Sequence, residues 1–182
     1  QVFWVAPRIA AGSEERGAIE AHARLSCSSL ASHGVVLVHG ALDAGLRQER
    51  LAAFRSGEAR ILVGTTVIEV GVDVPASTLI VIEQAESFGL AQLHQLRGRV
   101  GRGSEKSTCL LLRGEQLSET GRRRLALMRE TQDGFRIAEE DLELRGGGEL
   151  LGTRQSGDTP FRIATLEQMQ RLMDPATADA KL

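Results

Sequence analysis

Short apolar runs alternate with longer polar segments along the first part of the sequence, and this alternation limits the chain to few folds. The runs, rich in Val, Ile and Leu, occupy residues 2–5, 35–38, 60–64, 79–83 and 109–112. Continuously apolar strands are typical of a parallel sheet that helices cover on both faces. We therefore expect an α/β fold, with a doubly wound parallel sheet over residues 1–114.

The segments between the apolar runs carry the signals of helix ends. Ser13 is placed to cap a helix that extends to about His33, and Asp43 is placed to cap another that stops at Gly57. A third helix is expected over residues 90–100. Strands and helices are thus expected to alternate along this part of the chain.

The remainder of the chain has a different pattern. Apolar positions at helical spacing predict helices over residues 118–132 and 137–144, joined by an Asp-Gly pair and followed by a glycine-rich polar loop. We expect a helical hairpin with its loop over residues 115–168. Residues 169–182 have little to bury, and we expect them to form a flexible tail.

Charge is distributed unevenly along the chain. The 22 Lys and Arg residues and the 24 Asp and Glu residues give a net charge of −2. Residues 97–129 contain nine basic and three acidic side chains, a local charge of +6, so the rest of the chain carries −8. This segment is compatible with binding of a polyanion, such as a nucleotide or a nucleic-acid backbone, and equally with a solvated helix face.

The composition excludes several classes of protein. No apolar run approaches the ~20 residues that a membrane span needs, so we expect no membrane association. The two cysteines, Cys27 and Cys109, are far apart and form no CxxC pair, which argues against a disulfide framework or a zinc site. We expect no metal bound by this chain and a reducing, cytoplasmic location.

An unusual density of arginine marks residues 95–102, which read Gln-Leu-Arg-Gly-Arg-Val-Gly-Arg. On a helix, a spacing of three puts Arg99 and Arg102 on one face, and the interleaved glycines permit the close approach of a phosphate. Arginine does not deprotonate, so fixed guanidinium groups can stabilise the charge that develops during phosphoryl transfer. The alternative is an arginine-rich turn in solvent.

A second candidate site follows the third apolar run. Thr65 and Thr66 stand directly after this run, and a turn with Gly71 and Asp73 comes a few residues later. Ligands of doubly wound sheets bind at the carboxyl ends of the strands, where we expect all four residues. Hydroxyl groups and loop amides can hold phosphate oxygens, and an aspartate can accept a hydrogen bond from a ribose hydroxyl. Alternatively, these residues only cap and turn the chain.

These two segments resemble motifs of the C-terminal RecA-like domain of superfamily 2 helicases. Thr65, Gly71 and Asp73 resemble motif V of that superfamily, and residues 95–102 resemble its motif VI. Two further regions resemble motifs IV and IVa, namely residues 2–7 and the pair His39 and Gly40.

A narrower resemblance, to the RecG family of branched-DNA helicases, rests on the hairpin and its loop. The matching segments are residues 133–135, 141–146 and 148–157. The resemblance covers about residues 1–168. One departure is Gly147, where the family usually has a proline.

The resemblance implies a role for each matching residue. Arg99 and Arg102 would be catalytic arginine fingers that reach ATP across a cleft, and Gly71 and Asp73 would bind the nucleotide with them. The DNA contacts would come from Thr65, Thr66, His39, Gly40 and, in the loop, Gln155. Arg124 and Arg145 would link the hairpin to the motor.

Two motifs of a complete motor are absent from the sequence. It has no GxxxxGK[ST] loop for phosphates and no acidic Mg²⁺ motif after a strand. The resemblance therefore implies that ATP with Mg²⁺ is bound mainly by a first RecA-like domain absent from this chain, and that the chain alone is inactive. The expected partners are branched double-stranded DNA, as in stalled forks and Holliday junctions, and the N-terminal RecA-like and wedge domains of the same protein. The resemblance also implies that the protein acts in recombination and repair, in the bacterial cytoplasm at the nucleoid.

Two other functions stay open on the sequence alone. The translocase of a transcription-repair coupling factor shares the hairpin, and a protein-binding domain upstream would favour it. A non-catalytic module that binds nucleic acid or a protein partner would keep the fold without the chemistry. A phosphate-binding loop and a DExH-like box in the same gene would decide for the enzyme.

Overall fold

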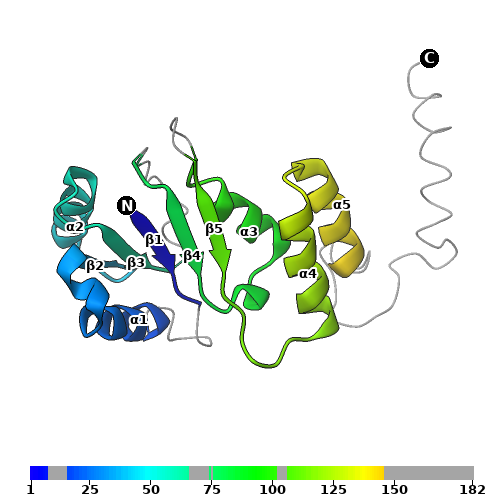
Figure 1. Cartoon of the computed structure of the whole chain (residues 1–182), viewed down its shortest axis with the longest axis horizontal. Helices are drawn as coiled ribbons and strands as arrows, with labels where there is room; N and C mark the ends of the chain where they lie inside the picture. The colour runs from blue at the N-terminus through cyan, green and yellow to red at the C-terminus, as the bar shows by residue number, and fades with distance from the viewer. Residues whose placement is uncertain (8–15, 66–73, 75, 102–105, 146–182) are drawn as a thin grey trace, which may run out of the picture. The chain divides into compact units, whose positions relative to one another are not determined.

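The structure is a computed structural model that describes residues 1–7, 16–65, 74, 76–101 and 106–145 (Figure 1). The chain divides into two compact units, residues 1–137 and 138–182. The strands are β1 (Val2–Val5), β2 (Val35–Val38), β3 (Ile61–Gly64), β4 (Leu79–Ile82) and β5 (Thr108–Leu111). The helices are α1 (Arg16–Ser26), η1 (Ser29–His33), α2 (Ala44–Ser56), η3 (Ala85–Ser87), α3 (Leu90–Arg97), α4 (Glu119–Glu130) and α5 (Gly134–Arg145).

The described strands form one parallel sheet in the order β2-β3-β1-β4-β5. Each predicted apolar run coincides with one strand to within a residue, so the predicted α/β fold with a parallel sheet is confirmed. β1 lies in the middle, where Val5 is in register with Gly64 of β3 and Ile82 of β4. The spacing of the runs along the chain does not specify this order.

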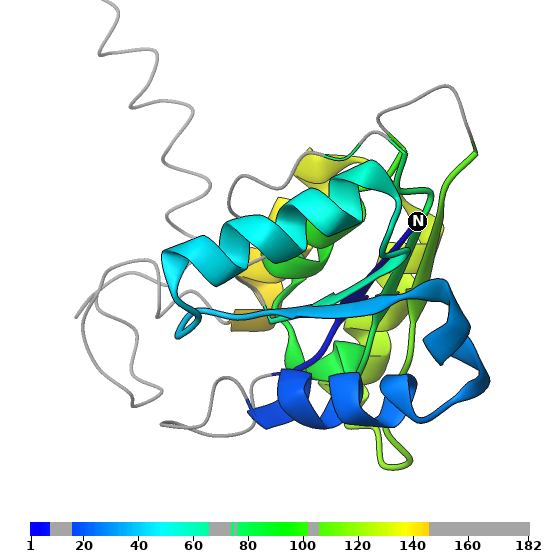
Figure 2. The same ribbon diagram turned by 90° about the vertical axis from the view of Figure 1, so that its left-hand side faces the viewer.

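Helices cover both faces of the sheet, and Figure 2 shows α1 and α2 on opposite sides of it. On the first face, α1 packs on β2 and β3; the fully or nearly fully buried residues of this layer are Ala18, Ala21, Leu25, Leu37, Ile61 and Val63. On the second face, Phe54 of α2 contacts Phe3 of β1, with ring centroids 5.2 Å apart. Two apolar layers therefore hold the sheet, as the continuous apolar strands predicted.

The predicted helix ends are partly confirmed. Asp43 caps α2 through a 2.8 Å hydrogen bond from the Gly45 amide, and Gly57 ends it with a positive φ of 82°. The single helix expected up to His33 is wrong, because α1 stops at Ser26 and η1 follows. Ser28 causes this break, since its hydroxyl accepts from the Leu30 amide at 3.1 Å and starts the new turn. The expected cap at Ser13 lies outside the described residues.

Two helices follow the sheet, as predicted. The Ser118 hydroxyl caps α4 by accepting from the Gly121 amide at 3.1 Å. α5 begins at Gly134, earlier than expected, because the Asp133 carboxylate accepts from the Phe135 amide at 2.9 Å. The expected glycine-rich loop and flexible tail lie outside the described residues. Within the described ranges, no helix has the length and apolar character needed to cross a membrane.

Candidate functional site

Three residues expected to contact DNA lie where β2 and β3 end. His39 follows β2, Thr65 follows β3, and both are buried, with exposed fractions of 9% and 3%. Gly40 is exposed beside His39. The carboxyl ends of β3, β1 and β4 are joined beyond the strands, because the Ala6 amide donates to the Gly64 carbonyl at 2.9 Å and the Glu83 amide donates to the Val5 carbonyl at 2.9 Å. This edge is therefore a continuous, ordered row of strand ends.

Arg47 fixes the loop that carries His39 and Gly40, a role that the sequence did not reveal. Its guanidinium, on α2, donates to the carbonyls of Gly40 at 2.8 Å and Leu42 at 3.1 Å. The backbone carbonyls of an irregular loop have no partners in a helix or a sheet, so they need hydrogen-bond donors from side chains or water. A basic residue early in the following helix is the only signal that the sequence offers for this contact.

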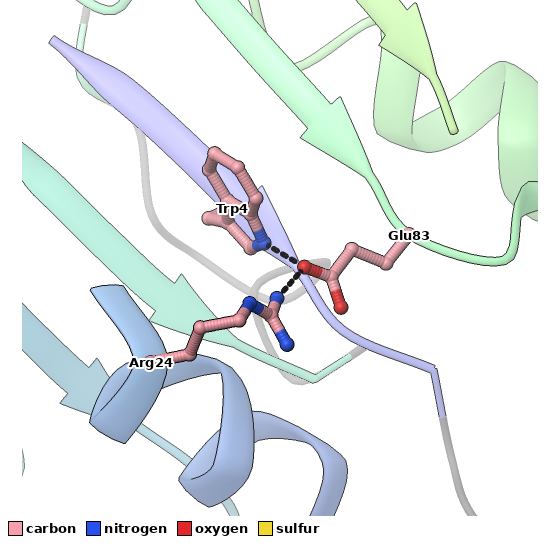
Figure 3. Close-up of polar contacts among 3 residues, drawn as sticks. All are labelled: Trp4, Arg24 and Glu83. Atoms are coloured by element: carbon pink, nitrogen blue, oxygen red, sulfur yellow. Dashed lines mark hydrogen bonds and ion pairs between the residues drawn. The ribbon is translucent and has the colours of Figure 1, made fainter. Parts of the chain in front are cut away.

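Glu83, directly after β4, ties three elements together at this edge (Figure 3). One of its carboxylate oxygens accepts a hydrogen bond from Trp4 Nε1 of β1 at 2.7 Å and forms an ion pair with Arg24 of α1. The Glu83 side chain is only 18% exposed, whereas that of Arg24 is 57% exposed. The buried part of the contact therefore ties β1 to the end of β4, while the exposed Arg24 adds only a weak link to α1.

Arg99 lies at the opposite, amino edge of the sheet. It follows α3 and is half-buried, and its amide continues the last helical turn by donating to the Leu96 carbonyl at 3.0 Å. Gly101 then packs against Ser107, the residue before β5. The segment after α3 therefore reaches the start of β5. Arg102 lies outside the described residues.

Only Thr65 of the four residues expected at the carboxyl edge is described, so the grouping of Thr65, Thr66, Gly71 and Asp73 stays a prediction. Thr65 stands at the carboxyl edge, but the next described residue, Val74, belongs to a turn at the amino edge. The Val74 carbonyl accepts from the Ser77 amide at 2.9 Å, and the Thr78 amide donates to the Gln1 carbonyl before β1 at 3.3 Å. The chain reaches the amino edge before β4 because a connection between two parallel strands of one sheet, here β3 and β4, must return to the start of the second strand. Thr66, Gly71 and Asp73, between these two points, lie outside the described residues.

Arg124 of α4 packs against η3 of the sheet unit. Its Nη1 lies 3.5 Å from the Glu86 carbonyl oxygen, and Glu86 Oε1 accepts from the Gly114 amide at 2.8 Å. A Cβ on Gly121 would lie 3.2 Å from the Glu86 Cβ, so an alanine there would require a shift of a few tenths of an ångström between α4 and η3. Arg145 ends α5, but its side chain lies outside the described residues, as does Gln155.

A groove of about 440 Å³ lies beside β5, between the end of α3 and the end of α4. Its lining residues include Arg97, Cys109, Met128 and Arg129. Burial raises the pKa of the Cys109 thiol above its ordinary value, and the nearby positive charge of Arg97 acts in the opposite direction. In the parts of the chain that the structure describes, no group of His, Cys, Asp and Glu residues could hold a metal ion.

Known proteins resemble this chain in both sequence and structure. RecG, an ATP-dependent DNA helicase, from Acidithiobacillus ferridurans is 51% identical over 185 residues, which cover 100% of this chain and 27% of that protein. A solved structure of RecG bound to a three-way DNA junction has a TM-score of 0.68 and 42% identity, over 94% of this chain and 22% of that chain. Dbp5 of S. cerevisiae shares the fold, with a TM-score of 0.55 at 18% identity over 79% of this chain and 37% of that one.

The chain spans about a quarter of the length of the curated relatives that it matches. A family model described as "ATP-dependent DNA helicase RecG, domain 3, C-terminal" matches residues 131–181. A family model described as "Helicase conserved C-terminal domain" matches residues 11–104, more than half of the chain. The expected resemblance is thereby confirmed, and the chain belongs to the family of helicase conserved C-terminal domains, in the form found in RecG.

Proposed function

We propose that this chain is the C-terminal motor lobe of an ATP-dependent DNA helicase that remodels branched DNA, including stalled forks and Holliday junctions, during recombination and repair. One observation carries the proposal most directly. The described residues of the two helicase-like motifs separate to opposite sheet edges, with Thr65 at the carboxyl edge and Arg99 at the amino edge. One lobe can thus present a DNA-facing edge and a nucleotide-facing edge at the same time.

ATP would bind in a cleft between this lobe and the first RecA-like domain. That domain would hold most of the nucleotide and the Mg²⁺, because this sequence contains neither a phosphate-binding loop nor an acidic motif after a strand. Bound Mg²⁺ would neutralise charge on the β- and γ-phosphates. Gly71 and Asp73 would contact the nucleotide, while Arg99 and Arg102 would stabilise the charge of the transition state.

The DNA contacts would come from the carboxyl edge and from the loop after the hairpin. We assign Thr65, Thr66, His39 and Gly40 to the phosphate backbone, and Gln155 to the duplex. Arg124 and Arg145 would couple the hairpin to the motor. The packing of Arg124 and Gly121 against Glu86 supports this assignment for the first hairpin helix. We also assign the protein to the bacterial nucleoid, where its DNA substrates would lie; the relatives that it matches are bacterial.

Single arginine replacements in the full-length protein test this function. Arg99→Ala and Arg102→Ala are expected to lower DNA-stimulated ATP hydrolysis by about 10³- to 10⁵-fold, the range for loss of an arginine finger. Affinity for a three-way junction should change less than about twofold, since neither residue is assigned to DNA. Arg55→Ala, an exposed arginine on α2, is the matched control. Near-normal turnover in both variants would contradict the proposal.

A second replacement tests the coupling of hydrolysis to movement. Gln155→Ala should keep DNA-dependent hydrolysis and lose junction unwinding, because the loop would no longer engage the duplex. Proportional loss of both activities would count against this role. The isolated chain should hydrolyse no ATP, and hydrolysis by the chain alone would show that a partner domain is dispensable.

A further inference from the structure

β5 is the last strand of the sheet, and β4 pairs with only one of its two sides. Among the described strands, no other strand pairs with β5 (Figure 1). The amides of Thr108 and Leu112 donate to the β4 side, at 2.8 and 2.9 Å. Alternate residues of a parallel strand turn their backbone groups to opposite sides, so those of Cys109 and Leu111 point away from β4. This open side therefore offers backbone donors and acceptors to another extended chain.

The groove beside β5 follows this open side. Three consecutive residues of the strand line it, namely Cys109, Leu110 and Leu111. Since successive side chains point to opposite faces of a sheet, a groove that touches all three runs along the edge of the strand. Val100 after α3 and Met128 of α4 form parts of the walls. The volume of about 440 Å³ lies within the range of roughly 300–1,000 Å³ that ligand sites have.

Apolar side chains of β5 are exposed to solvent. Leu110 and Leu112 occupy alternate positions on one face and are 44% and 43% exposed. Proteins that do not use an edge strand commonly protect it with charged residues, because an apolar edge pairs readily with other chains. From Thr108 to Leu112 the sequence has no charged residue. The edge is therefore suited to a partner strand with apolar side chains.

The charged side chains in the lining of the groove are both arginines, Arg97 and Arg129. Arg97 is fixed, because its Nη1 donates to the carbonyl oxygens of Met128 at 2.9 Å and Thr131 at 2.8 Å. Arg129 is exposed and pairs with no carboxylate in the described part of the chain. Of the described residues that line the groove, none is acidic. The groove therefore favours a ligand that carries carboxylates.

We propose that the open side of β5 binds an extended, acidic segment of a partner protein, which adds to the sheet as the next strand. The backbone of this segment bonds to that of Cys109 and Leu111, and its apolar side chains cover Leu110. Its carboxylates lie beside Arg97 and Arg129. Main-chain hydrogen bonds supply affinity in such complexes, while the side chains select the sequence. The inference does not rest on the proposed function, because it involves neither ATP nor DNA.

The test uses the full-length protein and a fluorescent synthetic peptide, with three central valines between two pairs of aspartates and with both chain ends blocked. Fluorescence anisotropy measures its dissociation constant, which we expect at about 100 μM or below. A peptide with lysines in place of the aspartates should bind at least about tenfold more weakly. A peptide with N-methylated valines keeps charge and apolar surface but loses amide donors, so its affinity should also fall about tenfold or more.

Two pairs of variants locate the binding site. Arg129→Glu should weaken binding of the aspartate peptide at least about fivefold and strengthen binding of the lysine peptide. Arg122→Glu is its matched control, since Arg122 is exposed on the same helix but does not line the groove. Leu110→Asp should weaken binding similarly, whereas Leu112→Asp, at an equally exposed position outside the groove lining, should have less than about a twofold effect. If Leu110→Asp lowers the melting temperature strongly, the arginine pair carries the test.

Each contrary result overturns a stated part of the proposal. Absence of peptide binding, or equal binding of the aspartate and lysine peptides, would overturn the acidic ligand. Full affinity of the N-methylated peptide would overturn strand addition. Equal affinities of Arg129→Glu and Arg122→Glu would overturn the site. Displacement of the peptide by a single-stranded thymidine oligonucleotide, with the oligonucleotide's own affinity reduced in Arg129→Glu, would assign the groove to nucleic acid instead of a protein partner.

Discussion

Replacement of Gly101 by alanine should destabilise the fold through two separable effects. Gly101 has a positive φ of 79°, and a Cβ there would lie 2.4 Å from Ser107 Oγ and 3.3 Å from Ser107 Cβ. A left-handed backbone costs a non-glycine residue about 1–2 kcal/mol. Ser107 can rotate its hydroxyl away, and a displaced rotamer costs about 0.5–1.5 kcal/mol. We expect a total loss of about 1.5–3.5 kcal/mol in the free energy of unfolding.

Gly57 is the matched control, because it has a similar φ of 82° but no atom within 4 Å of its Cβ position. Gly57→Ala should therefore show the backbone effect alone, about 1–2 kcal/mol. Ser107→Ala, added to Gly101→Ala, should recover the contact effect and leave the backbone effect. Urea unfolding followed by the fluorescence of Trp4, the single tryptophan of the chain, measures each free energy.

The outcomes distinguish the two effects. Equal losses in Gly101→Ala and Gly57→Ala would refute the contact with Ser107, and no loss in either would refute the backbone argument. Because Gly101 stands between the two proposed arginine fingers, Gly101→Ala in the full-length protein should also lower ATP hydrolysis more than Gly57→Ala does. Equal hydrolysis in both variants would contradict a role for this turn in placing the arginines.

Three more predictions concern single side chains. The raised pKa of Cys109 keeps its thiol protonated, so iodoacetamide should modify it at least about tenfold more slowly than the exposed Cys27 at neutral pH. The stability that the buried neutral thiol contributes is fully present below the ordinary thiol pKa, and it is lost as pH rises through the raised pKa of the folded state. Glu83→Ala should cost about 1–3 kcal/mol in urea unfolding, because the indole N–H of Trp4 loses its acceptor, whereas Glu83→Gln should cost less. Phe135→Ser should change the unfolding free energy by less than about 0.5 kcal/mol, because Phe135 is 85% exposed; a larger loss would mean that the side chain is packed in solution.

The sequence specified the elements of this fold better than their arrangement. The apolar runs located each strand, and the Asp43 cap and the Gly57 stop bounded α2, because these signals are local. The break after Ser26 was missed, since a serine that continues a helix and one that starts a new turn look alike in sequence. Strand order was also beyond the local pattern, because it depends on packing between distant segments.

The candidate site shows the same limit. The arginine density of residues 95–102 was visible in the sequence, but the sequence did not show which of these arginines packs against α4. The Arg97 side chain donates to the backbone carbonyls of Met128 in α4 and of Thr131 directly after it. Carbonyls have no residue-type signature, so no sequence pattern could separate Arg97 from Arg99. The placement of Thr65 and Val74 at opposite edges likewise follows from parallel pairing, which spacing alone does not show.

The central position of β1 has a consequence for synthesis on the ribosome. Val2 pairs with Ile61 and Leu79, so β1 has no neighbour until β3 has been made. At about 5–20 residues per second, the first partner strand follows β1 by roughly 3–12 s. Phe3 and Trp4 stay without their neighbouring strands during that interval. Synonymous codons that slow translation between the two strands would therefore lower the yield of folded protein without changing a single side chain.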